Sequence, residues 1–94
     1  MQILTCPRCT PEVHLSDEVL NDVREELCSL LRKEQRLQGL TVLSRKQLPL
    51  IEAKFIVMHL TNADGTCHRC RAPVEERGAQ SCQKCRSLNL NWCG

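Results

Sequence analysis

Two short motifs decide how this chain folds: Cys67-His-Arg-Cys70 and, after an arm of eleven residues, Cys82-Gln-Lys-Cys85. Two cysteines separated by two residues can direct both thiolates toward one metal ion, and a second such pair completes a tetrahedral four-sulfur site for zinc. Pro73 and Gly78 favour turns in the arm, which return the second pair to the first. The motifs therefore predict a zinc site with Cys67, Cys70, Cys82 and Cys85 as ligands.

This zinc is expected to be structural. Four thiolates leave no coordination position for a substrate, and the metal supplies folding free energy that so short a segment cannot obtain from a hydrophobic core. The alternatives are a pair of disulfides, which need an oxidising compartment, and a redox pair of cysteines.

The start of the chain, Met1-Gln-Ile-Leu-Thr-Cys, has no basic start and no long apolar run, so no signal peptide is expected. A reducing cytoplasm is therefore predicted, and it favours metal over disulfides.

The sequence around both motifs resembles a zinc ribbon. The resemblance rests on Gly-Thr-Cys-His-Arg-Cys-Arg-Ala-Pro-Val at 65–74 and on Ser-Cys-Gln-Lys-Cys-Arg-Ser-Leu at 81–88. Ribbon families often have glycine directly after the second cysteine of each pair, where this chain has Arg71 and Arg86. A helix followed by Gly-x-Cys-x-x-Cys is also similar to the DksA/TraR zinc-finger proteins, which bind RNA polymerase, although the arm is shorter here and their acidic coiled-coil tip has no match. The resemblance implies a zinc ribbon in the C-terminal third.

A third pair of cysteines, Cys6-Pro-Arg-Cys9, has the same spacing and indicates a possible second zinc site. The chain offers four residues that could complete it: His14, Cys93, His59 and His68. Cys93 would require residues 88–92 to form a strand against residues 2–5. The alternative is a reduced dithiol. A catalytic redox motif is less expected, because such motifs accompany a βαβ pattern that this sequence lacks.

The first helix is predicted over about residues 17–37. Ser16 is a residue type that favours the N-cap position, and Gly39 is a residue type that often terminates a helix. Apolar residues recur every three or four positions and form one face, with a short heptad seam that could also bind a partner. That face is formed by Val19, Leu20, Val23, Leu27, Leu30 and Leu31. Cys28 lies in this helix with no cysteine near it in sequence, so we expect it to be a small buried hydrophobic residue.

A second helix is predicted over about residues 48–61, after a connector or short strand at Leu40–Leu43. Ser44 has capping-box spacing, and Pro49 suits a first helical turn. This helix is apolar around almost its whole circumference, which is typical of the buried centre of a fold. We expect its extra apolar surface to be covered by the first helix, the ribbon or another chain. A helix-turn-helix is not expected, because the second helix lacks a polar face for a DNA groove.

Charge is unevenly distributed along the 94 residues. Residues 1–66 have eight basic and nine acidic side chains, a net of −1, whereas residues 67–94 have five basic and two acidic side chains, a net of +3. The basic residues could simply offset the negative charge of a zinc tetrathiolate, or they could bind an anionic partner, either nucleic acid or an acidic protein face. Phe55 and Trp92 are the only aromatic residues, so a surface that stacks unpaired bases is not expected.

Together these patterns predict a small α+β zinc-binding protein of one domain, residues 1–94. Its expected parts are an N-terminal knuckle at 1–15, a helical hairpin at 16–62 and a zinc ribbon at 65–94, on which the hairpin packs. No stretch reaches the length of a membrane span.

The predicted function is that of a small regulatory interaction module that binds protein or nucleic acid through the basic ribbon surface. It is not expected to be an enzyme, because no catalytic set of residues stands out. One alternative is a structural or adaptor subunit that oligomerises through residues 48–60. Another is a metal-handling or redox protein that uses Cys6 and Cys9.

Overall fold

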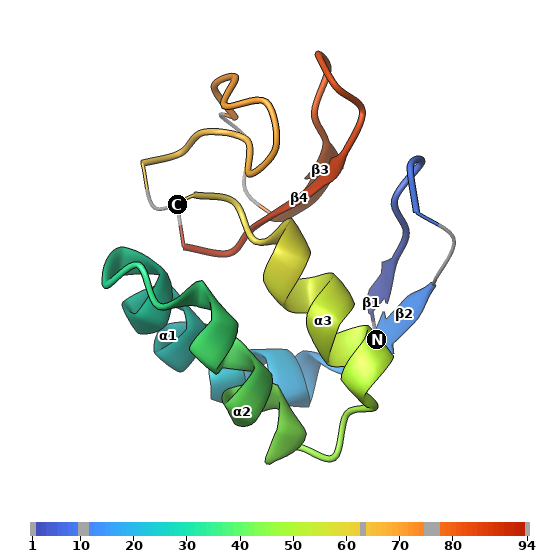
Figure 1. The fold of residues 1–94 in the computed structure, drawn as a ribbon. Coiled ribbons are helices and arrows are strands. Elements are labelled where there is room, and N and C mark those ends of the chain that lie inside the picture. The colour runs from blue at the N-terminus through green and yellow to red at the C-terminus, as the bar shows by residue number, and fades with distance from the viewer. Residues whose placement is uncertain (1, 10–11, 63, 75–77, 94) are drawn as a thin grey trace.

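The computed structural model describes residues 2–9, 12–62, 64–74 and 78–93 (Figure 1). Within these ranges the chain is a small α+β protein, as the sequence predicts. Two strands near the N-terminus, β1 (Gln2–Leu4) and β2 (Val13–Leu15), pair antiparallel, and so do β3 (Gly78–Ser81) and β4 (Leu88–Asn91). Along the chain, the helices follow β2 and precede β3. They are α1 (Asp17–Arg32), the 3₁₀ turn η1 (Arg36–Gln38), α2 (Gly39–Ser44) and α3 (Leu50–His59).

Helix α1 begins where the sequence predicts and ends earlier. The Ser16 hydroxyl accepts the N–H of Val19 at 3.2 Å, which confirms the N-cap. The helix ends at Arg32 and not near residue 37, because Glu34 adopts a left-handed conformation with φ of 58°. The N–H of Glu34 bonds the carbonyl of Leu31, and the N–H of Gln35 bonds that of Leu30. This is a Schellman termination, a role usually taken by glycine, which is why the sequence points to the wrong residue.

The expected connector at 40–43 is wrong, because those residues form helix α2. Gly39 does not stop a helix but begins this one. A Cβ at Gly39 would lie 2.9 Å from Leu27 Cδ2 and 3.1 Å from Val57 Cγ2, so the missing side chain lets α2 approach both other helices. The described helical region is therefore a three-helix arrangement and not a hairpin.

Helix α3 spans Leu50–His59, with Pro49 as its N-cap, and is shorter than the predicted 48–61. One face is buried, including Phe55 and Ile56, as expected for the centre of the fold. The opposite face is not covered by the described chain. Three large apolar side chains there are more than half exposed: Leu50, Ile51 and Met58.

A single main core joins the N-terminal sheet, the helices and β4. Its fully buried members include Leu15, Ile56 and Leu90, and Trp92 packs into the same core. Directly after α3, Leu60 forms a parallel bridge with Leu90, and the N–H of Thr61 bonds the Leu90 carbonyl at 3.2 Å. The C-terminal segment is thus fixed against the helices.

Residues 88–92 do not pair with residues 2–5, so that conditional prediction is wrong. The register places Ser81 opposite Leu88, which makes β3 and β4 a local hairpin around the second cysteine pair. Closing a short loop costs less chain entropy than joining the two ends of the chain.

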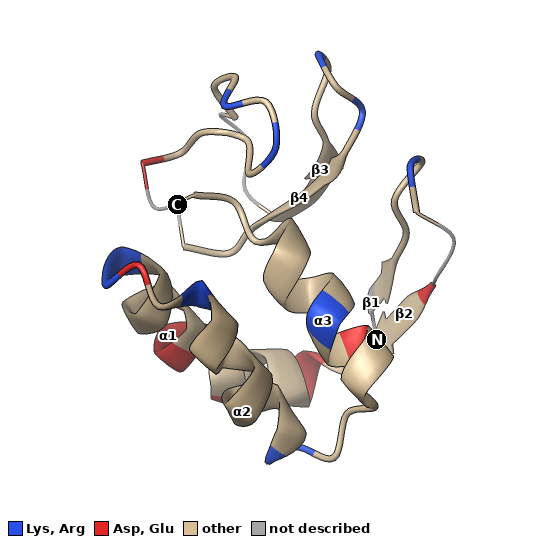
Figure 2. Ribbon diagram, in the orientation of Figure 1, with Lys and Arg blue, Asp and Glu red and all other residues tan. Residues whose placement is uncertain are grey.

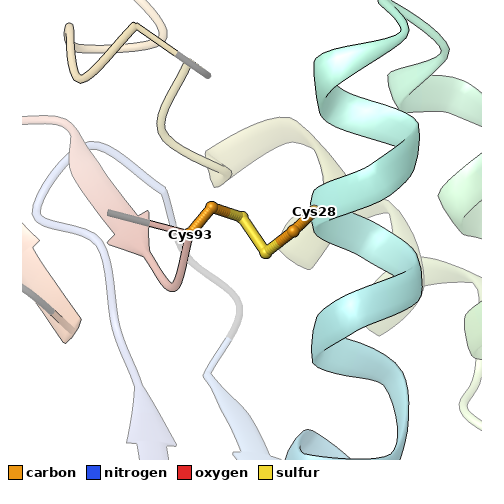
Figure 3. The surroundings of a disulfide bond; sticks show 2 residues. All are labelled: Cys28 and Cys93. Atoms are coloured by element: carbon orange, nitrogen blue, oxygen red, sulfur yellow. A yellow bond between two sulfur atoms is a disulfide. The ribbon is translucent and has the colours of Figure 1, made fainter.

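Cys28 and Cys93 form a disulfide, with a Cα–Cα distance of 5.5 Å (Figure 3). Cys28 is buried, as expected, but it is a disulfide partner and not only a small hydrophobic residue, and Cys93 is not placed to complete a metal site. The two residues are 65 positions apart. Only the tertiary fold, which carries the end of β4 back to α1, brings them together, and sequence spacing contains no sign of it.

Candidate metal centres

The four cysteines of the C-terminal motifs form one cluster in which all Sγ atoms lie within 4.8 Å of one another. Cys67 Sγ lies 3.7 Å from Cys85 Sγ, and Cys70 Sγ lies 3.5 Å from Cys82 Sγ. Tetrahedral zinc with Zn–S bonds of about 2.3 Å requires S···S separations of about 3.8 Å, whereas a disulfide requires about 2.05 Å. The cluster therefore fits a tetrathiolate metal ion and not two disulfides.

The two cysteine pairs are built as equivalent turns. In the first, the N–H of Arg71 bonds the Cys67 carbonyl at 3.1 Å and the N–H of Arg69 points at Cys67 Sγ at 3.4 Å. In the second, the corresponding bonds run from Arg86 to the Cys82 carbonyl, at 2.8 Å, and from Lys84 to Cys82 Sγ, at 3.4 Å. Backbone N–H groups aimed at sulfur favour the thiolate, which is the form that binds metal.

Each of these turns ends in a left-handed residue. The φ angles of Arg71 and Arg86 are 64° and 65°. This conformation costs a residue with a Cβ about 1–2 kcal/mol and costs glycine nothing comparable. The structure thus gives the physical reason why ribbon families often have glycine here, and it shows that both arginines adopt the strained conformation.

Asn89 supports the cluster from β4, and sequence analysis did not single it out. Its side chain is fully buried, its Nδ2 donates to Cys67 Sγ at 3.2 Å and its Oδ1 accepts the N–H of His68 at 3.1 Å. Burial raises the pKa of Cys67, but donors from Cys70, Asn89 and Arg69 outweigh it and lower the pKa to about 6. In the sequence, Asn89 is only one of two asparagines that alternate with leucine in this strand, so nothing marks it as a partner of Cys67.

A second cluster contains Cys6, Cys9 and His59. Cys9 Sγ lies 3.5 Å from His59 Nε2, which matches the separation of about 3.5 Å between sulfur and nitrogen ligands of one tetrahedral zinc. His59 Nδ1 lies 2.7 Å from the Phe55 carbonyl. It donates to that oxygen, so the Nε2 lone pair remains available to a metal, as is usual for ligating histidines.

The other three candidates for this cluster lie elsewhere. His14 is exposed, with its Nε2 2.9 Å from Glu12 Oε1. Cys93 is bonded to Cys28. His68 lies closest, with its ring centroid 5.2 Å from that of His59, but its Nε2 lies 2.9 Å from both the Ser87 hydroxyl and the Leu88 carbonyl. His59, the remaining candidate, is buried and stacked on Phe55.

Strand β4 contacts both clusters. The N–H of Leu88 points at Cys6 Sγ at 3.3 Å, and the next residue, Asn89, donates to Cys67 Sγ. Arg8 Nη1 also reaches the Cys85 carbonyl, at 3.4 Å. The two candidate metal centres are therefore neighbours, although their cysteines come from opposite ends of the chain.

Comparisons of the chain with family models, with curated proteins and with solved structures found no match. The similarity to zinc ribbons therefore rests on the four-cysteine cluster itself. Among the helices that the structure describes, none has the length and apolar character needed to cross a membrane.

Proposed function

We propose that this protein is a zinc-stabilised interaction module that binds the phosphate backbone of duplex nucleic acid. The observation that carries the proposal is a basic surface on the loops around the two metal centres. Duplex contacts suit this surface better than single strands, because stacking on unpaired bases needs exposed aromatic rings. Trp92 is buried, and so is Phe55.

The basic surface consists of five exposed residues on the three cysteine-bearing loops: Arg8, Arg69, Arg71, Lys84 and Arg86. Figure 2 shows basic positions on these loops at one end of the molecule, whereas several acidic positions lie along α1. None of the five forms an ion pair with an Asp or Glu that the structure describes; the ion pairs present there involve Glu12, Glu26 and Asp22. Within the described residues these positive charges are therefore not held in ion pairs, which supports attraction of an anionic partner.

Backbone strain supports a role for two of these arginines. Arg71 and Arg86 adopt positive φ angles that glycine would adopt at less cost. Strained residues persist where the surroundings hold them in place, and they concentrate at functional sites. Arginine at both positions costs backbone stability that glycine would not cost. This supports a role for the positive charge of the two side chains.

Substitution of both arginines with glycine is expected to weaken binding without damaging the fold. Arg71→Gly/Arg86→Gly removes two phosphate contacts, so the slope of log Kd against log salt should fall by about 1.8 for duplex DNA. Relief of the left-handed strain should leave the melting temperature unchanged or higher. Fluorescence anisotropy with a labelled duplex, measured over a salt series, gives the affinity and the slope.

Gln47→Gly is the matched control, because Gln47 also has a positive φ, 64°, and carries no charge. It should relax the backbone and leave binding unchanged. If the wild-type protein does not bind the duplex even at about 50 mM salt, the proposal is wrong, and an acidic protein face becomes the partner to test.

A second candidate function is self-association through α3, supported by the exposed side chains of Leu50, Ile51 and Met58. Light scattering coupled to size exclusion should then show a dimer that Ile51→Glu converts to a monomer, because a charge in an apolar interface is costly. Leu37→Glu is the control, since Leu37 is an exposed apolar residue on η1 and not on α3. A monomer at all concentrations would rule this candidate out.

A further inference from the structure

We infer that Cys6, Cys9 and His59 form a second zinc site of a different kind from the first, with three ligands from the protein and a small anion from solution as the fourth. The inference goes beyond the proposed function and does not depend on nucleic-acid binding. It rests on the donor set, the burial of each ligand and the charges around the cluster.

The number of ligands separates this cluster from the four-cysteine one. Tetrahedral zinc takes four ligands. Within the described residues the cluster contains two thiols and one imidazole, and His68 is not among the residues whose ligand atoms lie within 4.8 Å of one another. Zinc with three protein ligands exchanges its fourth ligand, whereas a tetrathiolate zinc is closed.

Burial indicates where the fourth ligand approaches. Cys6 and His59 are about 95% buried, with exposed fractions of 5% and 6%, whereas Cys9 is exposed. The buried sulfur and nitrogen hold the inner side of the site. A metal bound between these three residues therefore meets solvent on the side of Cys9.

The charge of the metal site and its surroundings indicates the chemical class of the fourth ligand. Two thiolates and a neutral imidazole leave zinc with no net charge. Arg8 lies in the turn between Cys6 and Cys9, and Arg69 directly follows His68, whose ring centroid lies 5.2 Å from that of His59, so both basic residues border the site. An uncharged centre beside two cations favours an anionic fourth ligand over a neutral one.

Cobalt substitution of the full chain tests the inference, because the d–d bands of cobalt respond to a change of ligand. Two cobalt ions per chain are expected. Titration with azide should shift the bands of one of them and leave the tetrathiolate ion unchanged. At about pH 8, where imidazole is neutral, azide should bind more tightly than imidazole. Native mass spectrometry should also find two zinc ions per chain.

Three variants assign the response. Cys9→Ser should reduce the metal content to one ion, remove about a third of the thiolate-to-cobalt absorbance, since two of six thiolates belong to this site, and abolish the azide response. His14→Ala should retain both ions, because His14 lies outside the cluster. Arg8→Gln leaves every ligand in place and should weaken azide several-fold without changing the affinity for imidazole.

Several results would overturn the inference. One ion in both the wild type and Cys9→Ser would show that this cluster holds no metal. Two ions with bands unaffected by azide would show that another group of the chain closes the site. An azide response that persists in Cys9→Ser would show that the exchangeable ligand binds at another site. Equal affinities for azide and imidazole would show that the site does not prefer an anion.

Discussion

Replacement of Cys82 by serine is expected to unfold the C-terminal segment and to lower the melting temperature of the whole chain by about 15 °C or more. Structural zinc contributes about 10–16 kcal/mol of apparent binding free energy near pH 7, so losing even a quarter of it costs about 3 kcal/mol. The effect reaches the helices, because β4 supplies Leu88 and Leu90 to the main core. Circular dichroism during thermal unfolding measures the shift.

The matched control is Gln83→Ser, which introduces the same residue one position further along the same turn. Gln83 is exposed and is not among the cluster residues, so its replacement should change the melting temperature little. A chelator added to the wild-type protein should reproduce the effect of Cys82→Ser. If Cys82→Ser and the chelated protein both melt at the wild-type temperature, metal does not stabilise this segment.

The sequence predicts well those features that depend on residues close together in the chain. The start of α1 follows from the Ser16 cap and the apolar period, and the four-cysteine cluster follows from two pairs separated by a short arm. The end of α1 does not follow in the same way. Glu34 terminates the helix in a conformation that glycine usually adopts, while Gly39 has a packing role between helices. A residue type suggests one use of a position, and the tertiary structure can impose another.

The second cluster and the disulfide illustrate the limit of spacing arguments. His59 is separated from Cys9 by 50 positions and Cys28 from Cys93 by 65. Such contacts form only because α3 packs beside the N-terminal turn and β4 returns to α1. Sequence patterns suggest Cys93 only as a candidate metal ligand, whereas its position beside α1 pairs it with Cys28 in a disulfide (Figure 3).

The chain combines a disulfide with cysteines suited to metal, and their surroundings explain the difference. In the four-cysteine cluster, N–H donors and an amide point at sulfur and favour thiolates, and several thiolates close together favour a cation. Cys28 lies on the apolar face of α1, and Cys93 packs against the main core. Neither cysteine belongs to a group of three or more possible metal ligands among the described residues. Oxidation of this pair is therefore compatible with metal at the other six cysteines.

Loss of the Cys28–Cys93 disulfide is expected to destabilise the protein by about 4 kcal/mol, because the bond closes a loop of 65 residues in the unfolded chain. For a domain of this size the melting temperature should fall by about 20 °C. Thermal unfolding with and without a phosphine reductant, which chelates zinc less than a dithiol does, measures the effect. The Cys28→Ser/Cys93→Ser protein should melt at the temperature of the reduced wild type.

That double variant also separates the predicted role of Cys93 as a metal ligand from its role in the disulfide that the structure shows. If its only role is the disulfide, the variant becomes insensitive to reductant and retains its full metal content, since both clusters keep their ligands. A metal ion lost together with Cys93 would show that this residue is a ligand and would contradict the pairing in Figure 3. A melting temperature equal to that of the oxidised wild type would show that the bond does not constrain the unfolded chain. The expected result is lower stability with unchanged metal content. It arises only if the disulfide and the metal ions crosslink different parts of the chain. The disulfide joins α1 to the C-terminal end, whereas the metal ions join the three cysteine-bearing loops near β4.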